Sequence, residues 1–242
     1  MKLKVFKVGI IGGSGVENLL LASDFRERSI KTEYGIVKAK EGTVDDKIVF
    51  FLNRHGAHYT PPSLIRYRAN IAALKRQGVQ AILATAAVGA IDRRMRPGDF
   101  VTLEDFIDFT SRRIQTFTEN SFIDLSRPYD PELAKKIAKA AGKLRLRMHR
   151  NAVYVCTEGP RFETKAEISM YGKLGVDVVG MTQVPEVVLA AEAGIPYATI
   201  GVVTNYAAGV SQKRVTSEEV LKVMADRKES LSKLLALVIK SL

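Results

Sequence analysis

The sequence predicts an α/β fold in which a largely parallel or mixed β-sheet is covered by helices. Short apolar runs bounded by glycine or proline recur along the 242 residues, as expected of buried strands. Segments with helical spacing of apolar residues lie between several of these runs. The chain contains no internal repeat, low-complexity stretch or linker rich in proline and serine. We therefore expect a single domain over residues 1–242.

The expected strands are apolar runs at residues 8–11, 48–52, 81–84, 100–103, 152–156, 176–179 and 197–203. The expected helices between them cover residues 62–77, 131–144, 165–173 and 184–193. A last helix is expected after Thr216, because Glu219 completes a capping-box pattern and apolar residues then recur at helical spacing. Residues 111–131 are polar and bulky by turns, which is typical of a functional or interfacial loop.

The composition is that of a globular protein, with 46% hydrophobic and 26% charged residues. No apolar run is long enough to span a bilayer, and the N-terminus leads directly into a strand pattern, so we expect a cytoplasmic protein without a targeting segment. The single cysteine, Cys156, excludes an internal disulfide and a cysteine-based metal cluster, and we expect a buried, inert thiol. The net charge of +11 is spread along the chain among acidic residues, so we expect no nucleic-acid binding. The same charge also suits a protein whose substrate is the phosphate anion, but it proves neither.

Two motifs that follow strands are suited to binding an anion. In Gly12-Gly13-Ser14-Gly15, backbone N–H groups and the Ser14 hydroxyl could cradle a phosphate, although a plain turn would look the same. It lacks the lysine of a Walker A loop. After the strand at 48–52, Arg54 lies beside His55 and His58, a cluster that can bind phosphate oxygens. The alternatives are a metal held by the two histidines and a surface loop with incidental charges.

Four further motifs could enclose a flat heterocycle and its sugar. Residues 85–90 are small, which leaves room for a ligand or allows tight helix packing. Phe162 could stack on a heterocycle and Glu163 could accept a hydrogen bond from its N–H edge, or Glu163 could simply sit at a helix N-terminus. Met181 offers an apolar wall, and Thr182 could bind phosphate or cap the next helix. Asn205 offers a donor and an acceptor that suit the edge of an oxopurine, or belongs to an ordinary turn.

Taken in this order, the motifs resemble the trimeric purine nucleoside phosphorylase and methylthioadenosine phosphorylase family over nearly the whole chain. The matching segments include GIIGGSG, RHG with a following histidine, PPSLIRYRANIAALK, RPGD, FID, EGPRFET and GMTQVPEVVLAAEAGIPYA. The resemblance implies a central mixed sheet flanked by helices, assembled as trimers or hexamers. It also implies phosphorolysis of a purine nucleoside, with inorganic phosphate as co-substrate and no metal or organic cofactor.

The resemblance assigns roles to particular positions. The phosphate ligands would be Ser14, Arg54, His55, the backbone at Ala87, and Thr182, with His58 nearby. The base would be held by Phe162, Glu163 and Asn205, and Met181 would lie under the ribose. A neighbouring subunit's loop, around Phe122 here, would complete the sugar site. Family members usually carry a hydroxyl or amide at the position of Ala86, and Thr85 could replace it through a local shift.

Base preference is implied by two positions. Members that act on 6-aminopurines have an aspartate where this chain has Asn205 and lack the glutamate matching Glu163, so the base site resembles that of enzymes for inosine or guanosine. At the 5′ side, Ser217 stands where a histidine binds the 5′-hydroxyl, and Val220 and Leu221 match apolar residues of the methylthio enzymes. This combination resembles S-methyl-5′-thioinosine phosphorylase. The alternatives are a methylthioadenosine phosphorylase, a nucleosidase that uses water, and a non-catalytic nucleoside-binding protein.

Overall fold

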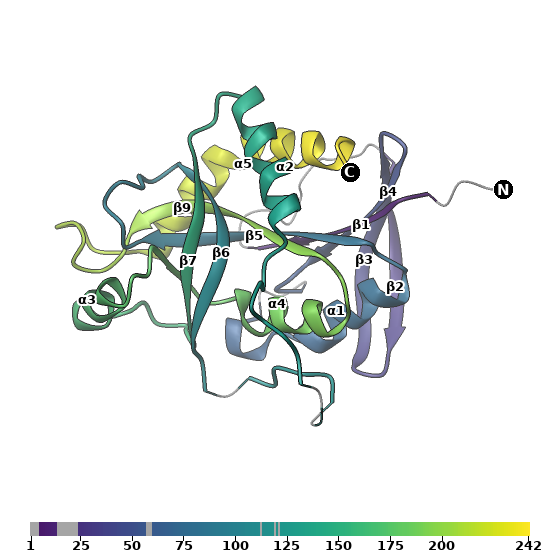
Figure 1. Cartoon of the computed structure of the whole chain (residues 1–242), viewed down its shortest axis with the longest axis horizontal. Helices are drawn as coiled ribbons and strands as arrows, with labels where there is room; N and C mark the ends of the chain where they lie inside the picture. Colours follow the sequence, from purple (N-terminus) through teal and green to yellow (C-terminus); the bar gives the residue numbers. More distant parts are fainter. Residues whose placement is uncertain (1–4, 14–23, 57–59, 112, 119, 121) are drawn as a thin grey trace.

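The computed structural model describes residues 5–13, 24–56, 60–111, 113–118, 120 and 122–242. Within these residues, a nine-stranded sheet runs through the molecule and helices cover both of its faces (Figure 1). The strands are β1 (Lys7–Gly12), β2 (Arg26–Thr32), β3 (Gly35–Val44), β4 (Lys47–Asn53), β5 (Ala81–Ala90), β6 (Phe100–Phe109), β7 (Met148–Thr157), β8 (Val178–Gly180) and β9 (Tyr197–Tyr206). The helices are α1 (Tyr67–Arg76), α2 (Pro131–Lys143), α3 (Lys165–Lys173), α4 (Gln183–Glu192) and α5 (Ser217–Lys240), with a short 3-10 turn at Pro62–Leu64. The expected α/β fold with a mixed sheet is confirmed.

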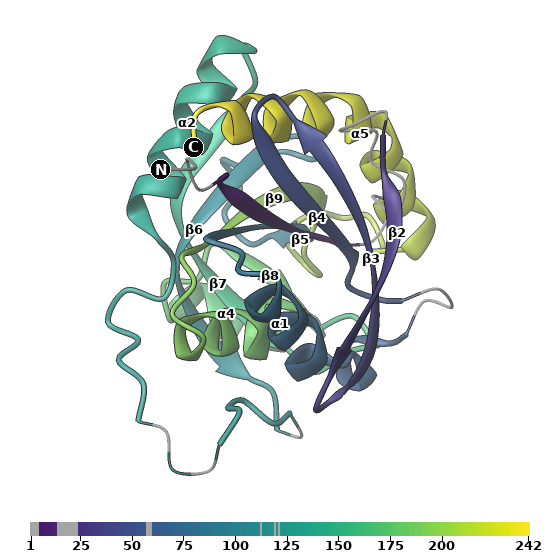
Figure 2. The ribbon, with the colours of Figure 1, turned by 90° about the vertical axis from the view of Figure 1, so that its right-hand side faces the viewer.

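The strands are arranged in the order β2-β3-β4-β1-β5-β8-β7-β6-β9. β2, β3 and β4 form an antiparallel meander, whereas β4, β1, β5 and β9 are joined by parallel pairings. Because β9 pairs with β5 as well as with β6, the strands from β5 to β9 close into a ring. In Figure 2 the β2–β4 end of the sheet faces the viewer.

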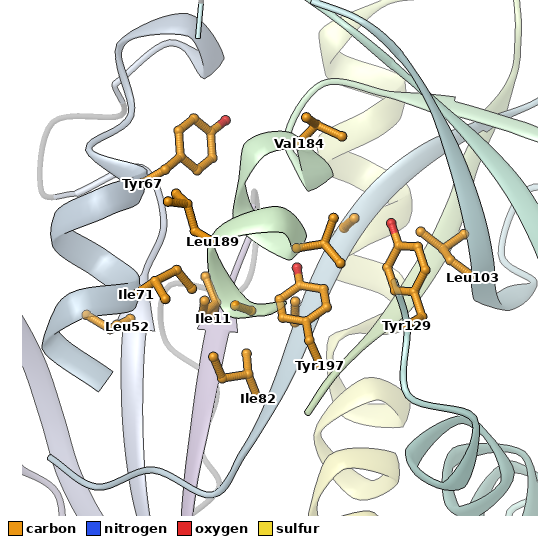
Figure 3. Packing of buried hydrophobic residues seen from close by; sticks show 14 of the residues in the cluster. Ile11, Leu52, Tyr67, Ile71, Ile82, Leu103, Tyr129, Val184, Leu189 and Tyr197 are labelled. Atoms are coloured by element: carbon orange, nitrogen blue, oxygen red, sulfur yellow. The ribbon is translucent and has the colours of Figure 1, made fainter. Parts of the chain in front are cut away.

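Two helix pairs cover the opposite faces of the sheet. Figure 1 shows α2 and α5 on one side, α1 and α4 on the other, and α3 at one end. Along β5, Ile82 packs with Ile11 under α1 and α4, whereas the next residue, Leu83, packs under α2 and α5. Figure 3 shows the first of these clusters, including Ile82, Leu189 of α4 and Tyr197. Burial on both faces explains why the central strands are apolar runs without polar alternation.

The β2–β3 hairpin was not expected from the sequence. Most β2 residues are exposed and charged, and only Ile30 and Thr32 of that strand are buried. Val37 and Ala39 of β3 pack with Ile30 in the cluster under α1. An edge hairpin of this kind buries few apolar residues, so it leaves no continuous apolar run in the sequence.

Several expected boundaries are corrected. β5, β6, β7 and β9 continue beyond the expected apolar runs, so the small residues at 85–90 and Asn205 lie within strands rather than after them. The helix expected at 62–77 is broken by extended backbone at Ile65, leaving α1 to begin at Tyr67. The strand expected at 176–179 begins only at Val178, after the turn at Gly175 that ends α3. The segment at 111–131 contains no helix or strand among its described residues before α2 begins.

Cys156 lies in β7, with its thiol fully buried in the core. Burial raises the pKa of this thiol to about 11, so it is neutral at pH 7, as expected of an inert structural cysteine. No helix in the described part of the chain is long and apolar enough to cross a membrane.

Candidate functional site

A cavity of about 570 Å³ opens where the parallel strands end. Gly13 follows β1, Arg54 follows β4, and Asn205 lies near the end of β9, so these residues converge at one edge of the sheet. The sequence-predicted residues in its wall are Arg54, His55, Ala87, Phe162, Glu163, Met181, Thr182, Asn205, Ser217, Val220 and Leu221. Ser14 and His58, which were also predicted, lie outside the described residues.

Arg54 is fixed by a buried acidic partner. Its Nε and Nη2 donate to the Glu186 carboxylate at 2.7 and 2.6 Å, and its Nη1 donates to the Thr85 carbonyl at 2.8 Å. Burial by itself lowers the pKa of the guanidinium, but the Glu186 carboxylate outweighs burial and raises it, so Arg54 remains cationic. Glu186 thus occupies the edge of the guanidinium formed by Nε and Nη2. One N–H on each terminal nitrogen remains for an anion.

Gly13 is required by the close approach of its neighbours. A Cβ at this position would lie 2.9 Å from both Arg54 Nη1 and the Thr85 carbonyl oxygen. The Gly13 N–H donates to the Thr85 hydroxyl at 3.0 Å. Thr85 is fully buried and is not part of the cavity wall, so it does not replace the missing hydroxyl at Ala86.

His55 lies in the wall beside Arg54 and is almost fully buried. Its Nδ1 lies 2.8 Å from the Thr60 carbonyl oxygen, which can only accept, so Nδ1 carries the proton of that bond. The His55 backbone N–H donates to Asn53 Oδ1 at 3.1 Å. The ring is therefore held in one orientation at the same end of the cavity as the guanidinium.

The small residues of β5 make room for the cavity. Ala86, Ala87 and Gly89 all line it, and the pairing of β5 with β9 shifts register beside Gly89. A Cβ at Gly89 would lie 3.2 Å from Asn205 Nδ2. Of the two sequence interpretations of residues 85–90, ligand space is therefore supported at this point of the strand.

Phe162 and Glu163, in the loop between β7 and α3, both line the cavity. Phe162 is partly exposed, and the Thr157 hydroxyl donates to Glu163 Oε1 at 2.6 Å. The helix that follows is capped by Thr164 and not by Glu163, whose carboxylate lines the cavity. Glu163 directly precedes this cap, so it does sit at the helix N-terminus, and its place in the cavity wall also allows it to accept a hydrogen bond from a ligand.

The Asn205 amide is oriented by its two neighbours in β9. Its Oδ1 accepts from the Thr204 hydroxyl at 2.8 Å, and its Nδ2 donates to the Tyr206 carbonyl at 3.0 Å. Each of these amide atoms can make one further hydrogen bond. Because Asn205 is buried in a strand, the ordinary-turn interpretation is corrected.

Met181 and Thr182 connect β8 to α4 and form another part of the wall. Thr182 occupies the N-cap position of α4, but its side chain makes no capping hydrogen bond. The capping interpretation is therefore corrected, and the hydroxyl is available for a ligand. Met181 Sδ packs against Gly159, where a Cβ would lie only 2.6 Å from it. The loop from Thr157 to Glu163, called the base loop below, is therefore closely packed against Met181.

The start of α5 closes the remaining side of the cavity with Ser217, Val220 and Leu221. The Thr216 side chain accepts the Glu219 N–H at 3.2 Å and begins the helix at the expected residue. This side is mainly apolar, because Val220 and Leu221 project from successive positions of the first turn.

Helix α3, which follows Glu163 and Thr164, is expected to lose stability in acid. Hydrogen bonds from Arg161 and from the Thr164 N–H hold the pKa of Glu167 at about 2, below its usual value near 4.5. Its deprotonated form is favoured by folding, so its stabilising effect is complete above about pH 4.5 and is lost as the pH falls towards 2. Glu167→Gln should flatten the dependence of Tm on pH in this window, and Glu132→Gln on α2 is the control. An equally steep dependence in Glu167→Gln would contradict this role.

Sequence reasoning missed two charged residues beside the cavity, Glu186 and Arg113. Both side chains are almost fully buried, at 0% and 1% exposure. Glu186 also accepts from the Tyr197 hydroxyl at 2.7 Å. An acid inside the apolar run at residues 184–191 of α4 is a signal that could have revealed Glu186, since buried charges are normally paired. Nothing in the local sequence distinguishes Arg113.

Comparisons with known proteins agree with this geometry. A family model described as "Phosphorylase superfamily" matches residues 7–240. A 6-oxopurine nucleoside phosphorylase of Pyrococcus furiosus is 48% identical over 240 residues, covering 95% of this chain and 90% of that protein. A probable S-methyl-5′-thioinosine phosphorylase of Methanopyrus kandleri is 46% identical, with 91% and 86% covered. The solved methylthioadenosine phosphorylase of Schistosoma mansoni with adenine superimposes with a TM-score of 0.93 at 33% identity, covering 98% of this chain and 91% of that one.

Proposed function

Since the chain belongs to the Phosphorylase superfamily, we propose that it is a purine nucleoside phosphorylase that prefers 6-oxopurine nucleosides. The observation that carries this proposal is one cavity with two chemically distinct sides. Arg54 and His55 form a cationic and hydrogen-bonding side for phosphate, and Glu163 and Asn205 form a polar side for a base. The strongest alternative is methylthioadenosine phosphorolysis, the activity named for the Schistosoma mansoni structure.

The reaction would join a phosphate oxygen to C1′ of the ribose as the bond from C1′ to N9 of the purine breaks. Positive charge develops on the ribose, and the phosphate anion bound beside Arg54 stabilises it. The departing purine gains electron density, and a hydrogen bond from the second N–H of Asn205 Nδ2 to N7 can stabilise it. Holding both reactants in one cavity removes much of the entropic barrier. Inorganic phosphate would be the co-substrate, without a metal or organic cofactor.

Preference for a 6-oxopurine would depend on Glu163. Such a base has an N1–H group, which can donate a hydrogen bond to one oxygen of the Glu163 carboxylate while the Thr157 hydroxyl donates to Oε1. A 6-aminopurine has no proton on N1 and would leave this carboxylate without that hydrogen bond. A site that binds a particular polar edge can discriminate strongly against a base that lacks it.

The apolar start of α5 favours a methylthio group at the 5′ position. Ser217 has a hydroxyl on a short side chain, whereas the imidazole of a histidine at this position reaches further into the cavity and can bond a 5′-hydroxyl. Ser217→His should therefore raise kcat/KM for inosine relative to methylthioinosine by about tenfold, the effect of one hydrogen bond. Steady-state kinetics on both nucleosides would measure it, with Ser217→Ala as the control. If the ratio of kcat/KM for inosine to that for methylthioinosine stayed unchanged, the 5′ group would not lie beside Ser217.

The proposed function is tested by base release from methylthioinosine, inosine, guanosine and methylthioadenosine, with and without phosphate. Phosphate-dependent release with methylthioinosine as the best substrate would support both the base and the 5′ assignments. A preference for methylthioadenosine would overturn the roles of Glu163 and Asn205 while leaving phosphorolysis in place. Release without phosphate would favour a nucleosidase, and binding without release would favour a non-catalytic protein.

We also propose assembly as a homotrimer or hexamer. Phe122, in the irregular segment before α2, is fully exposed. An aromatic side chain this exposed is suited to contact with a second subunit. In that arrangement the segment would complete the sugar side of a neighbour's cavity. Sedimentation of the wild-type protein and of Phe122→Ser would test the assembly.

A further inference from the structure

Arg113 lies in the irregular segment that follows β6, yet its side chain is only 1% exposed. It is not part of the wall of the large cavity. Instead it lies beside the segments that form that wall, with Tyr67 of α1 close to its guanidinium, 5.7 Å from Cζ to the ring centroid. Burying a guanidinium costs free energy unless its N–H groups find acceptors. The acceptors of Arg113 therefore indicate which parts of the structure it holds in place.

All five N–H groups of Arg113 have acceptors within two loops. Nη1 donates to the Met181 and Val184 carbonyls at 2.7 and 2.6 Å. Nη2 donates to the Glu158 and Thr157 carbonyls at 2.9 and 3.2 Å, and Nε donates to Glu158 Oε1 at 3.3 Å. A planar fork with five donors can join two loops in this way, which no other side chain can do.

The two loops carry the candidate ligands of the base and of the sugar and phosphate. The first runs from Thr157 to Glu163, and the Thr157 side chain itself holds the Glu163 carboxylate. The second runs from Met181 to Val184 and includes Thr182. Arg113 binds the backbone at the start of the first loop and at both ends of the second. Its guanidinium therefore holds these two loops at a fixed distance and angle to each other.

We propose that Arg113 is a positioning residue that fixes the base loop against the Met181–Val184 loop, and through it sets the selectivity for 6-oxopurines. The inference rests on the proposed function, because it assigns the alignment of that same site. Arg113 would control the position of Glu163 through its bond to the Thr157 backbone, without contacting the substrate itself.

The test is Arg113→Lys, because lysine keeps the charge but has only three donors on a single nitrogen. We expect kcat/KM for inosine to fall about 10- to 100-fold and the preference for inosine over adenosine to fall at least about tenfold, as misplacement of a binding group by about 1 Å would cause. Arg76→Lys, an exposed arginine in the last turn of α1 and outside the cavity wall, is the control and should leave both values unchanged. A purely structural role would lower the amount of folded enzyme or its Tm without changing base selectivity.

A folded Arg113→Lys protein with unchanged selectivity and nucleoside KM would overturn the proposal. If this variant does not fold, Glu158→Gln decides, because it weakens the bond from Arg113 Nε at a partly exposed carboxylate, together with the bond from the Ser111 N–H of the same segment. A loss of selectivity of about threefold would then support the role, in line with one weakened hydrogen bond, and no loss would refute it. Wild-type protein that releases no base from any nucleoside would instead refute the proposed function itself.

Discussion

Arg54→Met is expected to reduce kcat/KM for phosphate by about 10²- to 10³-fold, since it removes the cation that faces the anion. The same change leaves the Glu186 carboxylate buried without its ionic partner. An unpaired buried charge costs about 3–5 kcal/mol, so the free energy of unfolding should also fall sharply. Phosphate saturation curves and denaturant unfolding would measure the two effects separately.

A double variant separates catalysis from stability. Replacing Glu186 by leucine together with Arg54→Met removes both charges, and an apolar pair of similar volume often restores the stability of a buried ion pair. Tyr197 would keep its hydrogen bond to Gln183 at 3.0 Å. We expect the double variant to recover stability but not the response to phosphate. Recovery of both stability and the response to phosphate would show that Arg54 acts only in folding. A normal KM for phosphate in Arg54→Met would show that Arg54 is not part of the anion site.

Asn205→Asp should change base preference towards 6-aminopurines. A carboxylate offers only acceptors, so it loses the donor for an oxopurine and gains an acceptor for a 6-amino group. The Thr204 hydroxyl can still donate to the new side chain, whereas the Tyr206 carbonyl loses its donor. We expect the ratio of kcat/KM for inosine to that for adenosine to fall about 10²- to 10³-fold.

The measurement is steady-state kinetics on both nucleosides under saturating phosphate. Asn205→Ala is the control, because it removes the amide without supplying an acceptor and should weaken both substrates. Selectivity that stays the same in Asn205→Asp would exclude Asn205 from the contact with the base.

The order of the central elements could be predicted from the sequence, because buried parallel strands are continuous apolar runs. The candidate ligands were found for a related reason, since they follow or end those runs, as Arg54 follows β4. The β2–β3 hairpin was missed because its charged residues face solvent and only alternate positions are buried.

The interactions that hold the ligands in place could not be predicted. The Arg54 partner, Glu186, lies 132 residues away in the chain, and the Val184 carbonyl bound by Arg113 lies 71 residues away. Carbonyl acceptors carry no side-chain signature, so no pattern in residues 111–131 marks Arg113. Thr157 was missed for a similar reason, because its contact with Glu163 depends on the curvature of the loop between them.

The closure of β5 to β9 into a ring also determines where this protein is protected against aggregation. Because β9 pairs back onto β5, β2 is the one strand in the described part of the chain that pairs with a single neighbour, and its other side is an open edge of the sheet. That strand carries Arg26, Glu27, Arg28 and Lys31, all exposed. Charges at an open edge discourage the addition of a foreign strand. The β2–β3 hairpin, which the sequence did not reveal, therefore protects the sheet against aggregation through its charged edge.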